Sequence, residues 1–191
     1  MRSDFKFIQV SFVFTLLYCL ITFTYAAPQG GDVLEGDAVI EQNGNQTTIT
    51  QHSEQTLIQW QSFDVAQSQK VEFIQPNTDS IVINNIVGGQ ASFINGEITA
   101  NGQVVLINNQ GFVFTSGSFL QADSLTLAAA DLSQDDNGNW LIQSTGENAQ
   151  IINAGVIEVQ NGHLILLANQ IVNTGDIINH FGDIKIIADQ G

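Results

Sequence analysis

Short apolar runs separated by polar residues, asparagine and glycine recur along the chain from Gln29 onward. The apolar residues are mostly Ile, Val and Leu, and only one proline follows Pro28. Such β-branched runs are typical of short strands, whereas the spacing of an amphipathic helix is hardly present. The pattern predicts an all-β fold.

The C-terminal part of the chain contains an internal repeat. Residues 152–157 match residues 172–177, and residues 161–170 match residues 181–190, both at an offset of 20 residues. An earlier copy at 94–110 has a shorter spacer. This period is too short for a helix pair and is typical of one coil of a parallel β-solenoid, in which stacked coils bury what no single coil can bury. An antiparallel sandwich is the alternative, but it does not explain the fixed offset.

Asparagine and glycine lie between the strands of each repeat, where the chain must turn. Both residue types readily adopt the positive φ angles of tight bends, and we expect them to do so here. With strands about 4.8 Å apart, roughly eight coils would form a rod about 40 Å long. The predicted structural turns are Asn95, Gly96, Asn101, Gly102, Asn153, Gly155, Asn173 and Gly175.

The first 26 residues are expected to be a signal peptide. Arg2 and Lys6 precede an apolar run at 7–24, and cleavage after Ala26 places small or neutral residues at the positions that signal peptidase reads. A transmembrane helix is the alternative, since the run approaches the length of a membrane span. The single cysteine, Cys19, lies in this segment, so thiol chemistry and zinc–thiolate sites are excluded from the mature chain.

The charge of the chain excludes several classes of partner. The full sequence carries a net charge of −15, and removal of residues 1–26 leaves Lys70 and Lys185 against eighteen carboxylates, a net charge near −16. Because nucleic-acid binding depends on Lys and Arg that neutralise phosphates, we expect no nucleic-acid partner. No cofactor is expected either.

Several motifs, taken in order, resemble the haemagglutination-activity or two-partner-secretion domain at the N-terminus of filamentous-haemagglutinin-like exoproteins. The resemblance covers roughly residues 33–187. Asn109 and Gln110 stand where the family signature has proline and asparagine, and Asn85 stands where arginine is common. The motifs that carry the resemblance are residues 58–65, 71–77, 84–89, 92–96, 100–102, 108–114 and 125–132.

The resemblance implies a right-handed parallel β-helix that an outer-membrane barrel transporter recognises in the periplasm through its POTRA domains. The module would be threaded outward and fold at the surface, as the secretion domain of an adhesin that binds a host-cell receptor or carbohydrate. A tight solenoid turn is the alternative role for each signature residue. Implied recognition residues are Gln75, Pro76, Asn77, Asn108, Asn109, Gln110 and Gly111.

The organisation expected for the mature domain, 27–191, is a β cap, a stack of coils and an extruded hairpin. Asp136–Asn139 signals a two-residue turn in the hairpin. The chain stops in mid-repeat at Gly191, which suggests a truncated exoprotein or a gene fragment. An exported β-helix binding protein or a degenerate adhesin fragment is therefore the alternative to a secretion module. The expected parts are 33–92 for the cap and first coils, 93–130 for the signature coils, 131–150 for the hairpin and 151–191 for the 20-residue repeats.

Two further constellations are interpreted structurally. Asp135, Asn137 and Asn139 have the spacing that begins a calcium loop, but Trp140 and Gly146 replace its glycine and its bidentate glutamate, so a hairpin turn is favoured. The three histidines, at 52, 163 and 180, have no ligand at metal-site spacing, and no metal is expected.

An enzyme acting on polysaccharides is the alternative class of function, because such enzymes also use parallel β-helices. The mature chain has no arginine and two distant lysines, which argues against cleavage of acidic sugars. Exposed aromatic residues beyond Phe112, Phe114 and Phe119 would instead indicate a binding surface. The candidate glycosidase carboxylates are Glu97, Glu158, Asp176 and Asp183, and solvated acids on a solenoid face are the simpler interpretation.

Overall fold

The computed structural model describes residues 27–144 and 149–188. Within these ranges every regular element is a β-strand. The same residues contain no helix of the length and apolarity that a membrane crossing requires. The expected signal peptide and its cleavage point at Ala26 lie outside the described residues.

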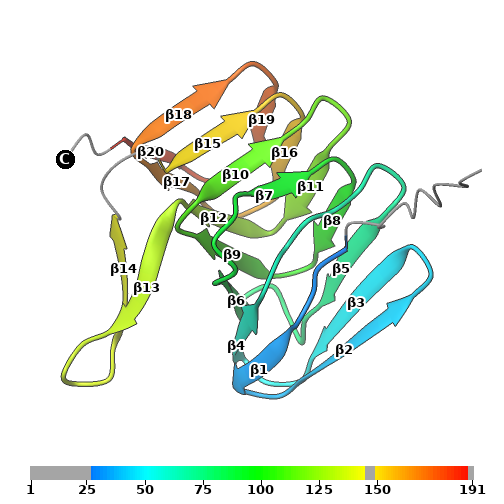
Figure 1. The fold of residues 1–191 in the computed structure, drawn as a ribbon, viewed down its shortest axis with the longest axis vertical. Helices are drawn as coiled ribbons and strands as arrows, with labels where there is room; N and C mark the ends of the chain where they lie inside the picture. Colours follow the sequence, from blue (N-terminus) through cyan, green and yellow to red (C-terminus); the bar gives the residue numbers. More distant parts are fainter. Residues whose placement is uncertain (1–26, 145–148, 189–191) are drawn as a thin grey trace, which may run out of the picture.

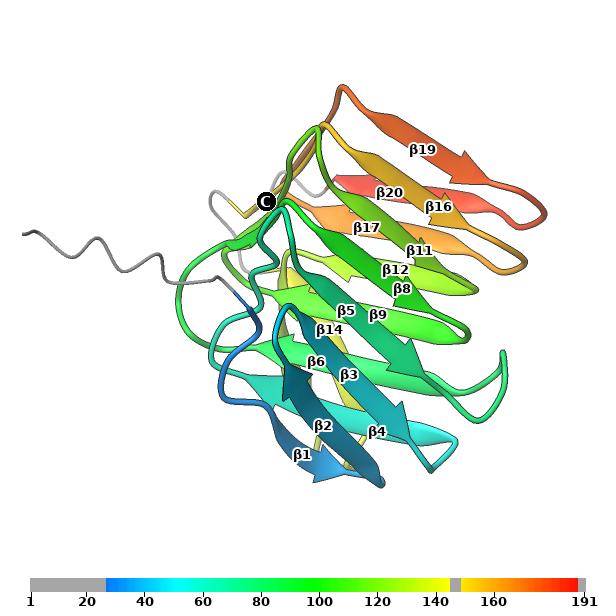
Figure 2. The same cartoon turned by 90° about the vertical axis from the view of Figure 1, so that its right-hand side faces the viewer.

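The strands form a right-handed parallel β-helix with three sides, and each coil is counted from its strand on side three, through side one, to side two (Figures 1 and 2). Side one contains β4 (Gln55–Trp60), β6 (Ile81–Ile86), β9 (Gln103–Asn108), β12 (Ser124–Ala128), β17 (Leu164–Ala168) and β20 (Ile184–Ala188). Side two contains β7 (Ser92–Ile94), β10 (Gly111–Phe114), β15 (Gln150–Asn153) and β18 (Gln170–Asn173). Side three contains β3 (Gln46–Gln51), β5 (Lys70–Ile74), β8 (Glu97–Ala100), β11 (Phe119–Ala122), β16 (Val156–Val159) and β19 (Asp176–Asn179).

The solenoid has about six turns, so the expectation of roughly eight coils was wrong. The reason is that four strands do not belong to coils. β1 (Asp32–Glu35) and β2 (Ala38–Asn43) form the cap, and β13 (Ala130–Gln134) and β14 (Trp140–Ser144) form a hairpin.

The predicted cap is confirmed, and it closes two sheets at once. β1 pairs antiparallel with β4 on side one, and β2 pairs antiparallel with β3 on side three. An uncovered first coil would present unpaired backbone groups that another chain could join. Only β1 and β2 form the cap. β3 and β4 already belong to the first coil, because they pair in parallel with the strands of the next coil.

The extruded hairpin is also confirmed, although its loop differs from the expected two-residue turn. Gln134 pairs with Trp140, which leaves a five-residue loop from Asp135 to Asn139. The Asp135 carboxylate accepts hydrogen bonds from the backbone amides of Asn137 and Asn139 at 2.9 and 2.8 Å, and Gly138 has a φ of 82°. The Asn139 side-chain amide donates a third hydrogen bond to the same carboxylate. The loop therefore closes around Asp135.

The core is a set of inward-facing columns that run along the solenoid axis. At the capped end, Trp60, Phe63 and Phe73 pack with ring centroids 5.3 and 6.5 Å apart. Asn84 is fully buried beside them, and its side-chain oxygen accepts a hydrogen bond from the Trp60 indole at 3.0 Å. Asn84 is thus a polar side chain with a partner in a column that is otherwise apolar.

A column on side one gives a direct test of how the core depends on stacking. The strand registers place Leu106, Leu127, Leu166 and Ile186 in one line. Leu106 is fully buried, whereas Ile186, in the last described coil, is 56% exposed. We expect Leu106→Ala to lower the free energy of unfolding by about 2–5 kcal/mol, because it leaves a cavity between coils.

Ile186→Ala removes an aliphatic chain of the same size from the same column and should cost less than about 1 kcal/mol, since that side chain is already half in water. Urea unfolding of both variants measures the difference. Equal losses would contradict a core built by coil-on-coil burial.

Candidate functional site

The implied recognition residues and the predicted turn residues lie at corners of the solenoid, but at three different ones. We name each corner by the sides that it joins. Gln75, Pro76, Asn77, Asn101 and Gly102 lie at the three–one corner, after β5 and β8. Asn108 to Gly111 lie at the one–two corner, between β9 and β10. The two–three corner carries the remaining predicted turns, Asn95, Gly96, Asn153, Gly155, Asn173 and Gly175. The structure therefore does not bring the two signature stretches into one site.

Gln75 is the centre of a buried hydrogen-bond network at the three–one corner. Its side-chain nitrogen donates to the backbone oxygen of Ser80 at 2.8 Å and to that of Gln103 at 3.2 Å. Its side-chain oxygen accepts from the amide of Gly102 at 3.1 Å, and the Asn101 side chain bonds both backbone groups of Gln75, at 2.7 and 2.8 Å. One glutamine thus fastens the second coil to the third.

Sequence reasoning missed the partner of this glutamine in the coil before. Gln51 is buried, and its side-chain oxygen accepts a hydrogen bond from Gln75 at 3.2 Å, while its nitrogen donates to the backbone oxygens of Ser53 and Ile81. The 24-residue offset between the two glutamines was the available signal. The first, second and third coils are therefore joined through side-chain amides at the same corner.

Asn77 and Pro76 differ from Gln75 because both are exposed. The Asn77 side-chain oxygen accepts from the backbone amides of Asp79 and Ser80 at 2.9 and 3.0 Å, and its nitrogen lies 3.2 Å from both oxygens of Glu54. Asn77 holds the turn by this local bonding. Its side chain still borders solvent.

Asn108 holds the one–two corner from inside. Its side chain is 1% exposed and donates to the backbone oxygen of Gln90 and to the hydroxyl of Ser92, both at 2.9 Å. Its oxygen accepts from the backbone amide of Gln110 at 2.9 Å. Gly111 follows with a φ of 89°, and a Cβ there would lie 2.1 Å from the Gln150 oxygen. Neither position can change without disturbing the corner.

The middle of this signature is more accessible than its ends. Asn109 is partly buried, and its nitrogen donates to the Asp131 carboxylate at 2.9 Å. Gln110 is exposed and donates to the side-chain oxygen of Asn109 at 3.1 Å. The two residues that depart from the family signature are thus the two that face outward.

Asparagines form a ladder at the two–three corner. The Asn153 side chain donates to the Asn173 side-chain oxygen at 2.7 Å, and Asn173 donates to the backbone oxygen of Gly175 at 3.0 Å. In an earlier coil, the Asn95 side chain accepts a hydrogen bond from the Thr115 hydroxyl. The predicted asparagines at this corner are therefore hydrogen-bonded within their turns or to the next coil.

The predicted reason for the corner glycines was wrong for most of them. Positive φ angles occur at Gly111 but not at Gly96, Gly102, Gly155 or Gly175. The requirement is instead close contact between coils: a Cβ at Gly175 would lie 2.1 Å from the Gly155 oxygen, and one at Gly155 would lie 2.0 Å from the Ser118 hydroxyl. These glycines are needed because neighbouring backbones touch there.

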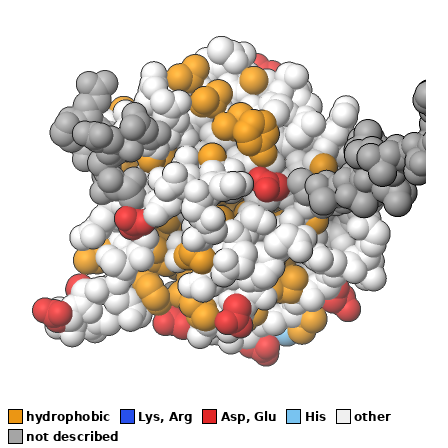
Figure 3. Space-filling model, viewed as in Figure 1, with side chains coloured by type: hydrophobic (Ala, Val, Ile, Leu, Met, Phe, Trp, Pro, Cys, Tyr) orange, Lys and Arg blue, Asp and Glu red, His pale blue; other side chains and the backbone are white. Residues whose placement is uncertain are grey.

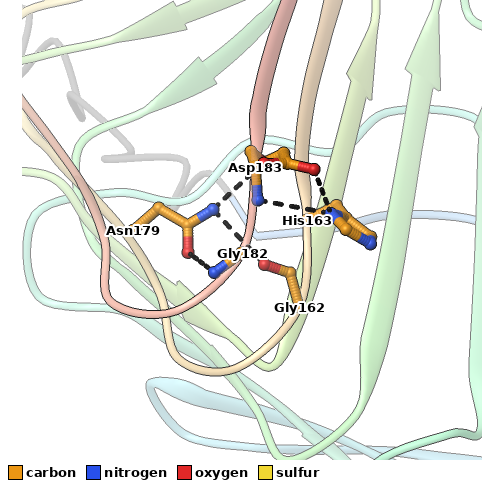
Figure 4. Close-up of polar contacts among 5 residues, drawn as sticks. All are labelled: Gly162, His163, Asn179, Gly182 and Asp183. Carbon is orange, nitrogen blue, oxygen red and sulfur yellow. Dashed lines mark hydrogen bonds and ion pairs between the residues drawn. The ribbon is translucent and has the colours of Figure 1, made fainter.

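Two histidine–carboxylate contacts join the last two described coils at the three–one corner. His180 lies 3.0 Å from Glu158, and the hydrogen bond from His180 holds the pKa of that carboxyl below its usual value. Asp183 donates its backbone N–H to Nδ1 of His163 at 3.3 Å (Figure 4). Nδ1 accepts this bond in the neutral ring, so the 3.9 Å approach of the Asp183 carboxylate is not an ion pair in that state.

Asn179 completes the same corner. Its oxygen accepts from the Gly182 amide at 3.1 Å, and its nitrogen donates to the backbone oxygens of Asp183 and Gly162 at 3.1 and 3.3 Å (Figure 4). Among residues 27–144 and 149–188, no three His, Cys, Asp or Glu side chains gather as metal ligands would. His52 is exposed on another coil.

The four carboxylates considered for glycoside hydrolysis have separate surroundings. Glu97 forms an ion pair with Lys70 at 3.2 Å, Glu158 contacts His180, and Asp183 lies near His163. Asp176 is exposed at the start of β19. Within the described ranges, no hydrogen bond joins any two of the four, whereas a glycosidase needs a facing pair.

The calcium-like spacing is explained by the hairpin loop. The Asp135 carboxylate is occupied by Asn137 and Asn139, and the side-chain hydrogen bond from Asn139 is the main cause of its lowered pKa. Among the aromatics named in the sequence, Phe112 and Phe114 are fully buried and Phe119 is partly buried. Phe93 and Phe181 are instead exposed, by 56% and 83%.

A capped right-handed parallel β-helix with an extruded hairpin and amide-lined corners is the class that this geometry defines. The family described as the TPS secretion domain matches residues 24–191. The chain belongs to this two-partner-secretion family, which is a family of secretion domains of exported adhesins and binding proteins.

Individual relatives agree with this assignment. The chain is 33% identical over 185 residues to a heme/hemopexin-binding protein of Haemophilus influenzae strain Rd, which covers 91% of this chain and 20% of the relative. A second H. influenzae protein of that name is 32% identical over 132 residues, 68% of this chain and 14% of the relative. The chain therefore spans about a fifth or less of these relatives.

A solved structure is similar in fold and in sequence. The crystal structure of the HMW1 secretion domain from H. influenzae has a TM-score of 0.79 and 31% identity, and the match covers 86% of this chain and 45% of that one. The predicted fold and the predicted family are both confirmed. Exoproteins of this family are secreted or surface-exposed.

The Gln75 network yields a prediction about stability. Gln75→Leu keeps the volume but leaves the Gly102 amide and the Ser80 oxygen without their partner, and Gln75 is only 5% exposed. We expect the free energy of unfolding to fall by about 2–5 kcal/mol, since each unpaired buried group costs about 1–3 kcal/mol. Thermal and urea unfolding measure this loss.

Gln110→Leu is the matched control, because it makes the same change in an exposed side chain that bonds only Asn109. It should change stability by no more than about 0.5 kcal/mol. A Gln75→Leu variant as stable as this control would contradict the role assigned to the network.

Proposed function

We propose that residues 27–191 act as the secretion module of an adhesin-like exoprotein, released from its signal peptide near Ala26. Periplasmic POTRA domains of an outer-membrane barrel transporter recognise the module, and it folds at the cell surface. Membership of the two-partner-secretion family supports this proposal. The signature residues are not equally accessible in the folded state, and this difference bears on when the transporter binds them.

The burial of Asn108 is the observation that carries the proposal. Asn108 and Gln75 are 1% and 5% exposed, and both side chains already have partners inside the fold. A transporter cannot bind these amides without opening the corners. We infer that recognition occurs before the corners form, while the signature side chains still face water, and that folding then withdraws them from the transporter.

The stacking of coils on one another supports folding on the outer side of the outer membrane. Each coil receives its backbone hydrogen bonds and its apolar contacts from the coils beside it, so a coil that emerges next to a folded coil finds a ready template. The burial of each new column of side chains is favourable and makes return to the unfolded state costly. The same dependence leaves a chain in transit without a core of its own.

Secretion of the chain with and without a candidate two-partner transporter tests the proposal. The Asn108→Ala, Gly111→Ala double variant should lose transporter-dependent release. Binding of chain diluted from urea to the purified POTRA domains should weaken at least about tenfold, which corresponds to about 1.4 kcal/mol of binding free energy.

Gly175→Ala is the matched control, since it disrupts coil contact at a corner outside the signature. It should fold poorly yet bind the POTRA domains like the parent while unfolded. Two results would overturn the proposal: a signature variant that is released normally, or a folded chain that binds the POTRA domains as well as the unfolded chain does.

A second function, contact with a host-cell receptor or carbohydrate, is favoured by an uncharged stripe on side two. Phe93, Val113, Ile152 and Val172 are in register across four strands and face outward. Figure 3 shows hydrophobic side chains gathered over this side. None of the four strands contains a charged residue, although the chain as a whole has a net charge of −15. We propose that an uncharged or apolar ligand surface docks here.

Phe93→Ala tests this second function. An exposed aromatic at the centre of a contact typically contributes about 2 kcal/mol or more, so binding of the chain to host cells or to a neutral glycan array should fall at least about tenfold. Phe181→Ala is the control, because Phe181 is more exposed but lies at the three–one corner, away from the stripe. Equal binding by both variants would exclude the stripe as the contact.

A further inference from the structure

The sequence contains five Asn–Gly dipeptides, and their chemistry is independent of transport. They are Asn43–Gly44, Asn95–Gly96, Asn101–Gly102, Asn137–Gly138 and Asn161–Gly162. In such a dipeptide the glycine backbone nitrogen can attack the asparagine side-chain carbonyl, because glycine has no side chain to hinder the approach. The reaction requires that nitrogen and that carbonyl to be free to meet. Hydrogen bonds to either group hold them apart.

Three of the dipeptides lie at corners where both groups are held. The backbone amides of Gly96, Gly102 and Gly162 donate to Val65, Gln75 and Asp123 at 3.0, 3.1 and 2.9 Å. The asparagine side chains are bonded as well: Asn95 to Thr115, Asn101 to both backbone groups of Gln75, and Asn161 to the Asp123 carboxylate at 2.6 Å. These groups can meet only when the corner opens.

The hairpin loop is an intermediate case. The Gly138 amide donates to the backbone oxygen of Asp135 at 3.0 Å, and the Asn137 side chain lies against the Asp135 carboxylate. The loop is otherwise exposed, and its contacts are local. It can open without unfolding any coil.

Asn43–Gly44 is different from the other four. Asn43 pairs with Gln46 at the tip of the cap hairpin, and Asn43 and Gly44 are both exposed. Within the described part of the chain, neither the Gly44 amide nor the Asn43 side chain has a recorded hydrogen bond, and no atom lies within 4 Å of a Cβ built on Gly44. The two reacting groups of this pair are therefore held by no hydrogen bond within the described residues, although the Asn43 backbone is paired in the hairpin.

We propose that Asn43 is a site of spontaneous deamidation in the folded protein, and that the three corner asparagines are protected from the same reaction by the solenoid. The Gly44 nitrogen forms a bond to Cγ of Asn43, the Cγ–Nδ2 bond breaks, and ammonia leaves with the displaced proton. Water then opens the five-membered imide at either carbonyl and yields aspartate or isoaspartate at position 43. No oxidant or reductant is involved.

The protection matters most at Asn101. In the fold its side-chain nitrogen donates to the Gln75 backbone oxygen. An aspartate there has no N–H to donate, and an isoaspartate lengthens the backbone by one carbon at a corner where coils are in register. Deamidation of Asn101 in an unfolded chain would therefore remove a contact between the second and third coils before it forms.

Peptide mapping by mass spectrometry tests the proposal on the unmodified chain, incubated at neutral to mildly alkaline pH either folded or in guanidinium chloride. In the folded sample, the 1 Da mass increase should appear first in the peptide with Asn43, then in that with Asn137. The corner peptides should lag by about tenfold or more, because protected groups react only from the open population. In denaturant, all five rates should lie within a few-fold of one another.

Asn43→Gln is the variant control, since a longer amide forms the cyclic intermediate much less readily. It should abolish the early mass increase and leave the other four rates unchanged. A folded sample in which Asn95, Asn101 or Asn161 converts as fast as Asn43 would overturn the proposal. So would an unchanged Asn43 after the unfolded sample has converted.

Discussion

Close contact between neighbouring coils is the constraint on which the rest of this structure depends. Each coil takes one set of backbone hydrogen bonds from the coil before it and another from the coil after it. At the corners this spacing brings backbone against backbone, so that a Cβ at Gly182 would lie 1.7 Å from the Gly162 oxygen. Glycine is required there for space, and the corner groups that the strands leave unpaired need other partners.

Buried amide side chains supply those partners. Gln75 joins three coils, Asn108 closes the one–two corner, and Asn153 contacts Asn173 in the next coil. Each is inside the fold because an unpaired buried backbone group is expensive. Side chains used in this way are unavailable to a partner once the coil has formed. The folding role and any recognition role of these residues therefore belong to different stages, and the exposed Gln110 and Asn77 are the positions where both can coexist.

The fold class could be predicted from the sequence because each repeat in the sequence corresponds to one stacked coil. The 20-residue offset between Asn153 and Asn173 appears in the structure as a strand register and as a hydrogen bond. The number of coils was overestimated, since local pattern does not distinguish a coil strand from β2 or β13.

The site was less predictable: motif order along the chain placed Gln75 and Asn108 in one group, and only the three-sided winding assigns them to different corners. The burial of Asn84 could not be predicted, because an asparagine in a strand gives no sign that it faces inward, and its partner, Trp60, is not another amide.

The extruded hairpin extends the dependence between coils beyond nearest neighbours. β13 leaves the fourth coil and contacts β9 in the third, and the Trp140 indole donates to the Glu35 carboxylate in the cap at 3.3 Å. Leu132 of the hairpin packs against Ile107 and Ala128 on the outer surface of side one. Part of that face is therefore apolar and covered. The capped end is thus contacted by a segment that the chain supplies only in its fourth coil. Among the described residues, the later coils have no such return contact and are joined only to adjacent coils, by strand pairing and by corner bonds such as Asn179 to Gly162. Because stability is distributed according to such contacts, the capped half is expected to open less readily than the last two coils.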